Sequence, residues 1–392
     1  MPLALHLLAL AVFAQGTSEF MLSGLVPDIA HDLGVSVPAA GALTSAFAIG
    51  MIVGAPLMAV LAARWSRRAA LFGSLSVFLL AHVVGAVTGD YGVLLATRVV
   101  AALANAGFLA VALATAASMV GPEAKGRATS ILLGGTTLAC VVGVPGGALL
   151  GQFLGWRAAF WAVALICVPA LVAVVRSVPA GAGTRVGARA ELAALRSPRL
   201  LTVLLLGALV NGATFCTFTY LAPVATEVTR LGAGWVPVLL ALFGLGSFAG
   251  VSAAGRLSDT YPMRVLVLGG SALLLGWILF ALLAGNTTAT LVLALVQGGL
   301  SFAVGSTLIA QALYAASGAP TLAGGLATAA LNVGAALGPW AGGLAIGGGL
   351  GYRGVPGVSA LLVTLAFVVT CVARVVRGRA GGGATDEAVV AS

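Results

Sequence analysis

Residues 46–68 read AFAIGMIVGAPLMAVLAARWSRR, and residues 242–264 read LFGLGSFAGVSAAGRLSDTYPMR. The two stretches align without a gap at a spacing of 196 residues, half of the chain's 392, and share a phenylalanine, two glycines, a leucine and the last arginine. The same spacing pairs four further positions: Gly16 with Gly212, Pro27 with Pro223, Gly151 with Gly347, and Arg157 with Arg353. Self-similarity at a fixed period marks a duplicated structural unit, so the sequence predicts two similar halves.

The composition places both halves in a membrane. Apolar residues make up 60% of the chain and charged residues only 7%, against about 25% charged residues in soluble domains. The net charge of +9 does not indicate nucleic acid, because the basic residues lie in short gaps between apolar runs. The four cysteines lie singly without metal-ligand spacing, so no metal site is expected. A duplicated bundle of membrane helices is typical of secondary transporters, which makes a carrier the first hypothesis.

Apolar runs of about 20 residues, the length that spans a bilayer, recur along the whole chain. The first lacks a basic start and exceeds the apolar core of a signal peptide, so a retained span is expected. The twelve runs cover roughly residues 3–27, 38–62, 69–88, 91–119, 128–150, 157–175, 200–223, 235–256, 265–284, 289–314, 321–348 and 354–375.

The fold class predicted from these runs is an all-α membrane protein with twelve transmembrane helices in two pseudo-symmetric six-helix bundles. Residues 1–176 form the first bundle, 177–198 a cytoplasmic linker, 199–376 the second bundle and 377–392 a cytoplasmic tail. The linker is either a short surface helix over ELAALR or a solvated tether. With both termini in the cytoplasm, fifteen of the 19 basic residues fall on the inner side and three on the outer side. This bias predicts that orientation.

The gap between the second and third spans, and its counterpart between the eighth and ninth, resemble the cytoplasmic signature of the major facilitator superfamily, G-x-L-a-D-R-x-G-R-[RK]. The second copy keeps the glycine, leucine, aspartate and final arginine, whereas the first has Ala63 in place of the aspartate. The first copy's arginines are also explained as topology anchors. The resemblance implies a cytoplasmic gate made of Arg64, Arg67, Arg68, Gly255, Asp259 and Arg264.

Spans two, five, eight and eleven carry seams of small residues. Residues 334–343 fit G-x-x-x-G-P-x-x-G-G completely and, with GVPGG at 143–147, resemble the motif of the family's antiporter members. Glycine lets helices approach closely and proline bends them. In the family, span five packs against eight and span two against eleven, although ordinary helix packing is the alternative. Interdomain packing is therefore expected for Gly50, Gly54, Gly143, Pro145, Gly147, Gly246, Gly250, Gly334, Gly338, Pro339, Gly342 and Gly343.

Two strong charges lie inside predicted spans, Glu19 in the first and Arg98 in the fourth. Ionisable residues within a membrane are costly and are functional candidates by default. At about 1.5 Å per residue, Glu19 lies about 12 Å and Arg98 about 10 Å below the outer edge of the bilayer, at similar depth. The run QGTSEFMLSGLVPDIA at 15–30 resembles the first-span signature of twelve-span drug exporters, and L-x-x-x-R at 94–98 resembles part of the family's fourth-span motif.

We predict a proton-coupling role for Glu19 together with Arg98. Burial disfavours a charged carboxylate, and a nearby arginine favours it, so a site wetted from each side in turn can load and release a proton. One unit of pH gradient supplies about 1.4 kcal/mol, and 100 mV supplies about 2.3 kcal/mol per charge. The chain has no G-x-x-x-x-G-K-[ST] loop for ATP. A structural partnership with Arg98, or contact with a cationic substrate, remains open for Glu19, and a pure packing role remains open for Arg98.

By family analogy, spans one, four, seven and ten line the substrate path. Their side chains form a mostly apolar, aromatic and hydrogen-bonding surface, which suits a neutral amphipathic molecule better than a sugar phosphate. For each of these residues plain core packing is the alternative. The predicted cavity residues are Gln15, Phe20, Asn105, Phe108, Asn211, Phe215, Tyr220, Gln297 and Phe302.

Over its full length the chain resembles the twelve-span drug:proton antiporter branch of the superfamily. EFMLSGLVPDIA, GVPGG and GWRAAFW look most like the chloramphenicol resistance exporters of high-GC Gram-positive bacteria. The resemblance implies a bacterial plasma-membrane protein, acting as a monomer, that exports chloramphenicol or a related small drug. A proton gradient powers it, with no enzymatic activity, no cofactor and no nucleic-acid partner. An exporter of sugars, nucleosides or other metabolites is the alternative, and a non-transporting membrane receptor is a third reading.

Overall fold

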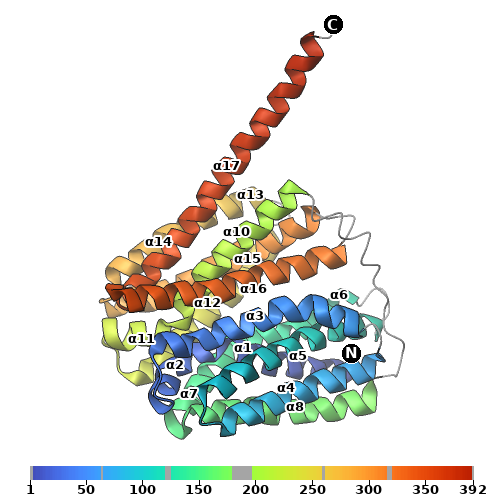
Figure 1. The fold of residues 1–392 in the computed structure, drawn as a ribbon, viewed down its shortest axis with the longest axis vertical. Helices are drawn as coiled ribbons and strands as arrows, with labels where there is room; N and C mark the ends of the chain where they lie inside the picture. The colour runs from blue at the N-terminus through green and yellow to red at the C-terminus, as the bar shows by residue number, and fades with distance from the viewer. Residues whose placement is uncertain are drawn as a thin grey trace.

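The computed structural model describes residues 3–62, 65–119, 125–178, 197–257, 261–315 and 320–390, which form helices joined by turns, with no strand among them (Figure 1). Eleven helices are long and apolar enough to cross a membrane, and a bent pair at the N-terminus makes a twelfth. The all-α fold with twelve predicted spans is thereby confirmed.

Spans one to six make up the first half of the chain. Ser66 caps the third span by accepting a hydrogen bond from the N–H of Ala69 at 3.2 Å. Asp90 caps the fourth by accepting one from the N–H of Val93 at 2.8 Å. These side chains satisfy N–H groups that a helix start leaves unpaired. The elements are α1 (Leu3–Phe20), α2 (Leu22–Asp32), α3 (Val37–Ala62), α4 (Arg67–Val87), α5 (Tyr91–Ser118), α6 (Lys125–Leu138), η2 (Ala139–Gly143), α7 (Val144–Leu154) and α8 (Trp156–Ser177).

Spans seven to twelve make up the second half. Ser197 caps the first of them by accepting a hydrogen bond from the N–H of Leu200 at 3.4 Å. The elements are α10 (Pro198–Thr219), α11 (Leu221–Pro223), η4 (Val224–Val228), η5 (Ala233–Trp235), α12 (Val236–Leu257), α13 (Pro262–Arg264), η6 (Val265–Gly269), α14 (Gly270–Leu283), α15 (Thr287–Ala315), α16 (Pro320–Ala345), η7 (Ile346–Leu350) and α17 (Gly354–Val390).

The first span is bent, which the sequence did not predict. Helices α1 and α2 meet at Met21 with an angle of 53° between them, and α2 continues through Pro27 to Asp32. Proline lacks the N–H that would bond to the carbonyl of Ser23, so the helix is weakened within two turns of the bend. The fifth span contains a π-helical turn, η2, directly before Pro145, for the same reason.

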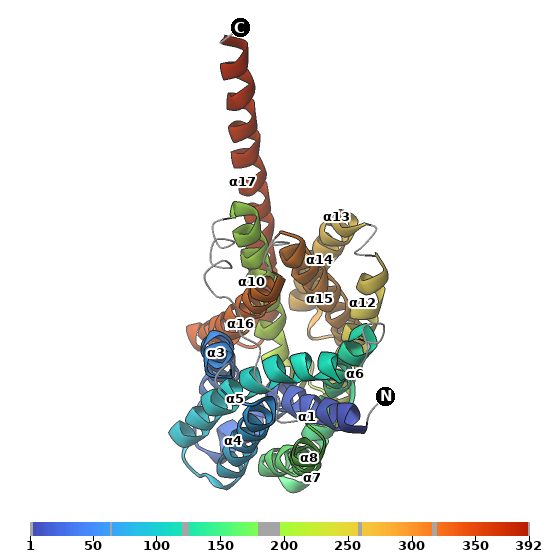
Figure 2. The same cartoon turned by 90° about the vertical axis from the view of Figure 1, so that its right-hand side faces the viewer.

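The twelve spans form two bundles that lie side by side, α1 to α8 in one and α10 to α17 in the other (Figures 1 and 2). One hydrophobic core is built from residues of the first half alone, while a second joins second-half residues to Phe20, Ala48 and Cys140 of the first. Helices α3 and α16 are in contact where the bundles meet, as are α7 and α12. Spans two and eleven, and spans five and eight, therefore pack across the two halves as expected.

The ends of the bundles differ. The turns at 33–36, 88–90, 229–232 and 284–286 lie at one end, which we call the short-loop face. We call the opposite end, with the N-terminus, the arginine-rich face. Helix α17 continues as one helix to Val390 and projects from the body of the molecule (Figure 1). The domain limits stay predictions, and linker residues 179–196 lie outside the described residues.

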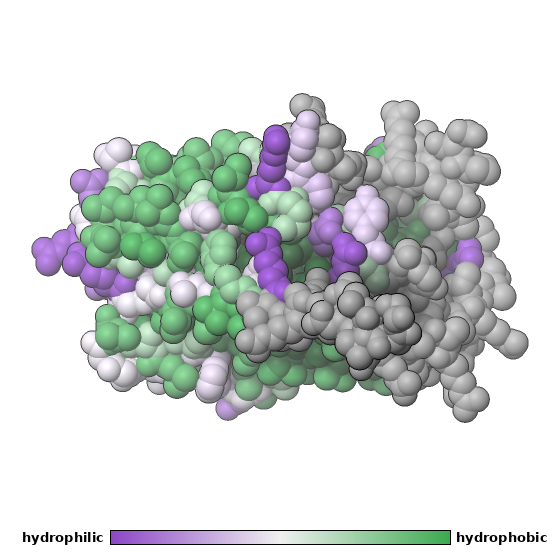
Figure 3. Space-filling model, turned by 90° about the horizontal axis from the view of Figure 1, so that it is seen from above, coloured by the Kyte–Doolittle hydropathy of each residue, from purple (hydrophilic) through white to green (hydrophobic). Residues whose placement is uncertain are grey.

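The flanks of the bundles are apolar. Figure 3 shows hydrophobic side chains over much of the flank of the second half, with hydrophilic residues at its left edge and in a group near the middle of the view. Leu268 and Leu282 are 69% and 68% exposed there, and Phe153 of the first half is 80% exposed. Exposure of large aliphatic and aromatic side chains over a whole flank is stable only where lipid is the solvent.

Candidate functional site

Arg98 of α5 is buried within the first half and bound to α1. Its guanidinium donates hydrogen bonds to the hydroxyl and to the backbone oxygen of Ser18, both at 2.8 Å. The same guanidinium lies 4.5 Å from the ring centre of Phe47 on α3. A planar guanidinium can donate two bonds and stack on a ring at once, which an ammonium group cannot do. Three helices therefore hold the arginine in one orientation.

A buried histidine completes this network. The ring Nε2 of His82 lies 2.6 Å from the Ser18 hydroxyl, and Nδ1 lies 2.8 Å from the backbone oxygen of Phe78. Because a carbonyl oxygen only accepts, Nδ1 carries the hydrogen. The Ser18 hydroxyl accepts from Arg98, so its own hydrogen is free to be donated to Nε2. A neutral imidazole with its hydrogen on Nδ1 satisfies both ring nitrogens of His82 and the Ser18 hydroxyl, whereas the Nε–H of Arg98 is buried without a partner.

Glu19 lies next to Ser18 on α1 and is partly exposed. Its charge and that of Arg98 act on one another. Among the described residues the ion pair that forms is between Arg157 and Asp32, and none joins Glu19 to Arg98. The carboxyl group is thus close to a fixed positive charge without being bound to it.

Aromatic rings from both halves meet between the bundles. Phe20 is the last residue of α1. Its ring centre lies 5.7 Å from that of Phe215 and 6.4 Å from that of Phe218, both on α10. Phe218 lies 4.7 Å from Phe243 of α12, and Phe243 lies 6.4 Å from Phe302 of α15. The rings enclose a cavity of only about 10 Å³. A drug-sized molecule therefore enters among these rings only if the halves separate.

Of the predicted cavity residues, Phe20, Phe215 and Phe302 come together in this aromatic cluster. The predicted amides Gln15 and Asn211 differ in their hydrogen bonding. Gln15 of α1 is 2% exposed, and both its amide atoms are buried without a hydrogen-bond partner. Asn211 of α10 instead donates to the backbone oxygen of Leu331 at 2.7 Å. A buried amide without partners is costly, so Gln15 is the one of these two whose hydrogen bonds are left for a ligand or water.

The other predicted cavity residues lie away from the aromatic cluster. Asn105 is buried and donates to the sulfur of Met51 at 3.5 Å, and Phe108 packs in the first-half core. Tyr220 donates to the backbone oxygen of Pro339 at 2.9 Å. Gln297 donates to the backbone oxygen of Leu273 at 3.1 Å, towards α14. Their assignment to the substrate path stays a prediction.

The glycine seams face the interior of each half, and the expectation that they pack the halves together is wrong for most of them. A methyl group on Gly50 or Gly54 would contact α5, and one on Gly246 or Gly250 would collide with the backbone of α15. Gly143 and Gly147 face Thr17 and Met21 of the first span, and Pro145 is buried in the same helix as Gly147. Gly334, Gly338 and Gly342 face α10. Among the seam glycines, Gly343 contacts the other half, at Pro38.

Helix geometry explains the correction. Neighbouring helices within one half approach most closely where the facing residues are small. Small residues also meet across the halves, but at positions other than most of the predicted seam glycines. Ser45 of α3 donates to the backbone oxygen of Ala336 on α16 at 2.6 Å. The carbonyl of Cys140 lies against Gly244 of α12.

The predicted gate lies partly outside the described residues. Arg64 and Asp259 are not described, and Gly255 lies near the end of α12. Arg67 and Arg68 begin α4. Arg264 stacks on the ring of Tyr261 at 4.8 Å. The gate therefore stays a prediction.

Contacts between the halves gather towards the short-loop face. The side-chain amide of Gln152 on α7 donates to the backbone oxygen of Ala233 at 2.5 Å. Leu240 of α12 lies against Gly24 of α2. This end of the pathway is closed in the structure.

Within the first half, the short-loop face is tied by a charged pair that the sequence did not single out. Arg157 pairs with Asp32 and donates to the backbone oxygen of Thr88 at 2.9 Å. Trp156 donates to the same carboxylate at 3.0 Å and lies under the guanidinium at 4.4 Å. The hydrogen bonds from α8 thus fix the end of the bent first span.

Sequence reasoning missed Ser18, His82, Phe218 and Phe243 as members of the site. Phe218 follows Phe215 by three residues, so helical spacing places both on one face. Phe243 pairs with Phe47 in the sequence repeat. Nothing in the sequence marked Ser18. In the part of the chain that the structure describes, no three His, Cys, Asp or Glu side chains gather as a metal site.

A family model described as Major Facilitator Superfamily matches residues 8–324. The chain is 59% identical over 374 residues to the chloramphenicol resistance protein of Streptomyces lividans, which covers 94% of this chain and 95% of that protein. It is 38% identical over 365 residues to the inner membrane transport protein YdhP of Escherichia coli (strain K12), covering 92% and 93% of the two.

Solved structures share the fold. A bacterial homologue of the human lysosomal transporter Spinster, in an inward-facing and occupied conformation, matches with a TM-score of 0.75 at 19% identity, over 94% of this chain and 96% of that one. A mutant of the nucleoside transporter NupG matches with a TM-score of 0.76 at 14% identity, over 94% and 99%. At such identities the likeness concerns the fold alone.

Proposed function

Starting from the fact that this chain belongs to the major facilitator superfamily, we propose that it exports chloramphenicol or a related small amphipathic drug from the cell in exchange for protons. The chain is a multi-pass protein of the cell membrane. The observation that carries the proposal is the match, over nearly all of both chains, to a relative named for chloramphenicol resistance. Resistance through a transporter fold implies removal of the drug.

The interior of the protein supports a substrate of this kind. Phe20, Phe215 and Phe218 offer flat apolar surfaces from both halves. Gln15 offers a buried amide whose donor and acceptor are both unused. Chloramphenicol combines an aromatic ring with hydroxyl and amide groups, so aromatic contact and a small number of hydrogen bonds are the interactions it needs. A phosphorylated substrate would need basic side chains there instead.

Proton coupling is assigned to Glu19. The carboxyl lies beside the Arg98 charge, but Ser18 and Phe47 hold the guanidinium in place. The arginine therefore stabilises the ionised carboxylate without blocking it. Proton uptake from outside and release inside then drive drug movement in the opposite direction, with no cofactor and no chemical conversion of the drug.

The proposal includes the orientation and the working unit. The arginine-rich face lies in the cytoplasm, following the distribution of basic residues. The structure is then closed towards the outside, where Gln152 and Ala233 join the halves. One chain contains both halves of the pathway, so a monomer embedded in lipid is sufficient for transport.

Reconstituted vesicles test the proposal. The chain is incorporated into liposomes with an internal pH dye, and chloramphenicol is added across a pH gradient. The wild-type chain is expected to move protons on drug addition, and Glu19→Gln is expected to abolish this movement. Glu227→Gln is the matched control, because Glu227 is an exposed glutamate near the short-loop face. Undiminished flux in the Glu19 variant removes that residue from the mechanism.

Drug-susceptibility testing of cells that express the chain separates the substrate classes. Resistance to chloramphenicol and related drugs supports the proposed function. Normal sensitivity to them, despite a folded protein in the membrane, refutes it and leaves the metabolite exporter as the alternative.

A further inference from the structure

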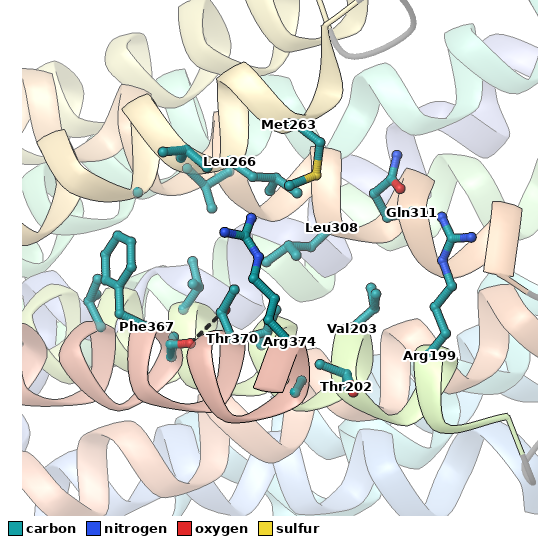
Figure 4. A pocket seen from close by; sticks show the side chains of 18 residues that line it. Arg199, Thr202, Val203, Met263, Leu266, Leu308, Gln311, Phe367, Thr370 and Arg374 are labelled. Atoms are coloured by element: carbon teal, nitrogen blue, oxygen red, sulfur yellow. Dashed lines mark hydrogen bonds between the residues drawn. The ribbon is translucent and has the colours of Figure 1, made fainter. Parts of the chain in front are cut away.

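A second cavity lies within the second half, apart from the pathway between the halves. It measures about 270 Å³ and opens among α10, the α13–α14 segment, α15 and α17. Figure 4 shows Arg374 of α17 reaching across it towards Leu266 and Leu308, while Arg199 of α10 stands beside Gln311. None of the residues placed in the proposed drug pathway lines this cavity.

The polar end of the cavity is positively charged. Arg199 begins the seventh span, and Arg374 ends the part of α17 that crosses the membrane, so both lie at the arginine-rich face. No Asp or Glu is present among the described residues of the wall. Neither arginine forms an ion pair within the described residues. In the part of the chain that the structure describes, two positive charges thus face a shared space without a counter-charge.

The rest of the cavity is apolar and runs into the membrane. From Arg374 the wall continues along α17 through Phe367 to Val363. Eleven residues of helix separate Arg374 from Val363, a depth of about 16 Å. The lining is therefore charged at the membrane surface and apolar below it. A phospholipid has the same arrangement, with its phosphate at the surface and its acyl chains below.

The cavity borders on a lipid-facing groove. Phe367 lines both the cavity and a groove on the outer flank of α14 and α17. The groove is otherwise formed by Ser271, Leu274, Leu275 and Ile278, of which Leu275 is 57% exposed. The cavity and the lipid-facing groove are thus neighbours that share the Phe367 side chain.

We propose that this cavity binds one anionic phospholipid, with its phosphate between Arg199 and Arg374 and an acyl chain along Phe367 towards Val363. Guanidinium groups bind phosphate oxygens through paired, charge-assisted hydrogen bonds. Basic pockets between membrane helices at the cytoplasmic surface are sites for anionic headgroups. The amide of Gln311 supplies a further donor. The proposal concerns binding and does not depend on the drug that the chain exports.

Native mass spectrometry of the full-length chain in detergent tests this site. The probes are phosphatidylglycerol, phosphatidylcholine with the same acyl chains, and glycerophosphoglycerol, which carries the headgroup alone. We expect one phosphatidylglycerol to remain bound while phosphatidylcholine dissociates at the same activation energy. Arg199→Gln combined with Arg374→Gln is expected to weaken phosphatidylglycerol binding at least tenfold, equivalent to about 1.4 kcal/mol.

Arg176→Gln is the matched control, because Arg176 ends α8, the helix of the first half that corresponds to α17, and does not line the cavity. It is expected to bind phosphatidylglycerol as the wild-type chain does. Leu266→Trp keeps both arginines and fills the cavity, so it separates loss of space from loss of charge and is also expected to weaken binding.

Three outcomes overturn the proposal. The first is phosphatidylglycerol binding to the double arginine variant with wild-type affinity. The second is equally tight binding of glycerophosphoglycerol, which would make the occupant a free anion and not a lipid. The third is displacement of the bound lipid by chloramphenicol at the concentration that half-saturates its export, which would make the cavity part of the drug site.

Discussion

Replacing Ser18 with alanine tests whether one hydroxyl holds Arg98 and His82 in place. The substitution removes an oxygen and leaves almost the same volume, so no cavity forms. It removes the 2.8 Å bond from Arg98 and the 2.6 Å bond to His82. The arginine keeps its bond to the Ser18 backbone oxygen and its contact with Phe47.

The magnitude follows from the two lost bonds. A hydrogen bond to a charged group contributes about 1.5–3 kcal/mol, and a hydrogen bond between membrane helices averages about 0.6 kcal/mol. Ser18→Ala is therefore expected to lower the free energy of unfolding by about 2–4 kcal/mol. Ser23→Ala is the control: Ser23 is also buried, but its hydroxyl bonds back to Phe20 within the same span. Such local bonds add little stability, so a change below about 0.5 kcal/mol is expected.

Unfolding in mixed micelles, titrated with SDS and followed by far-ultraviolet circular dichroism, measures both variants. A double-mutant cycle with His82→Phe isolates the bond between the two helices, because phenylalanine keeps the ring contacts with Phe78 and Phe160. A coupling of about 0.6–1.7 kcal/mol is expected. Equal stability of Ser18→Ala and Ser23→Ala, with no coupling to His82, would show that the network does not hold Arg98.

Three further results are expected. Gly250→Ala places a methyl group against the backbone of α15 and should lower the free energy of unfolding by about 1–3 kcal/mol. Gly305→Ala is the control, because its methyl group would have nothing near it, and it should be neutral or stabilising. Equal SDS midpoints for the two variants would contradict the close approach of α12 and α15. Gln152→Cys with Ala233→Cys, oxidised to a disulfide in a chain without other cysteines, should stop drug efflux until a reductant is added, and continued efflux by the cross-linked chain would exclude alternating opening. Phe218→Ala removes three ring contacts, each worth about 0.5–1.5 kcal/mol, so it should weaken closure of the aromatic cluster and reduce resistance measured as minimum inhibitory concentration; unchanged resistance with equal protein levels would remove Phe218 from the pathway.

The spans could be read from the sequence because each depends on its own residues. An apolar run of about 20 residues must form a helix in lipid, where every backbone group needs a partner within the segment. The capping residues Ser66, Asp90 and Ser197 set helix starts because each side chain accepts a hydrogen bond from the backbone N–H three residues further along. Such signals are local and survive without knowledge of the fold.

The site was only partly predictable. A charge inside a membrane is conspicuous, so Glu19 and Arg98 stood out, yet an ion pair was an open reading and the arginine binds Ser18 instead. The glycine seams were recognised as close contacts, but which neighbour they approach depends on how each helix is rotated. Gly250 and Gly343 illustrate the difference: one packs within its half, and the other contacts Pro38 across the interface.

The sequence by itself determined that this chain has two duplicated halves of six apolar helices, because hydrophobicity and repeat spacing act along the chain. Tertiary structure alone decided which side chains meet: the partners of Arg98, the aromatic cluster closed between the halves, and the charged cavity beside α17. The physical reason is that the apolar pattern fixes a helix's depth in the bilayer, while its rotation and neighbours are set by packing and hydrogen bonds with other helices.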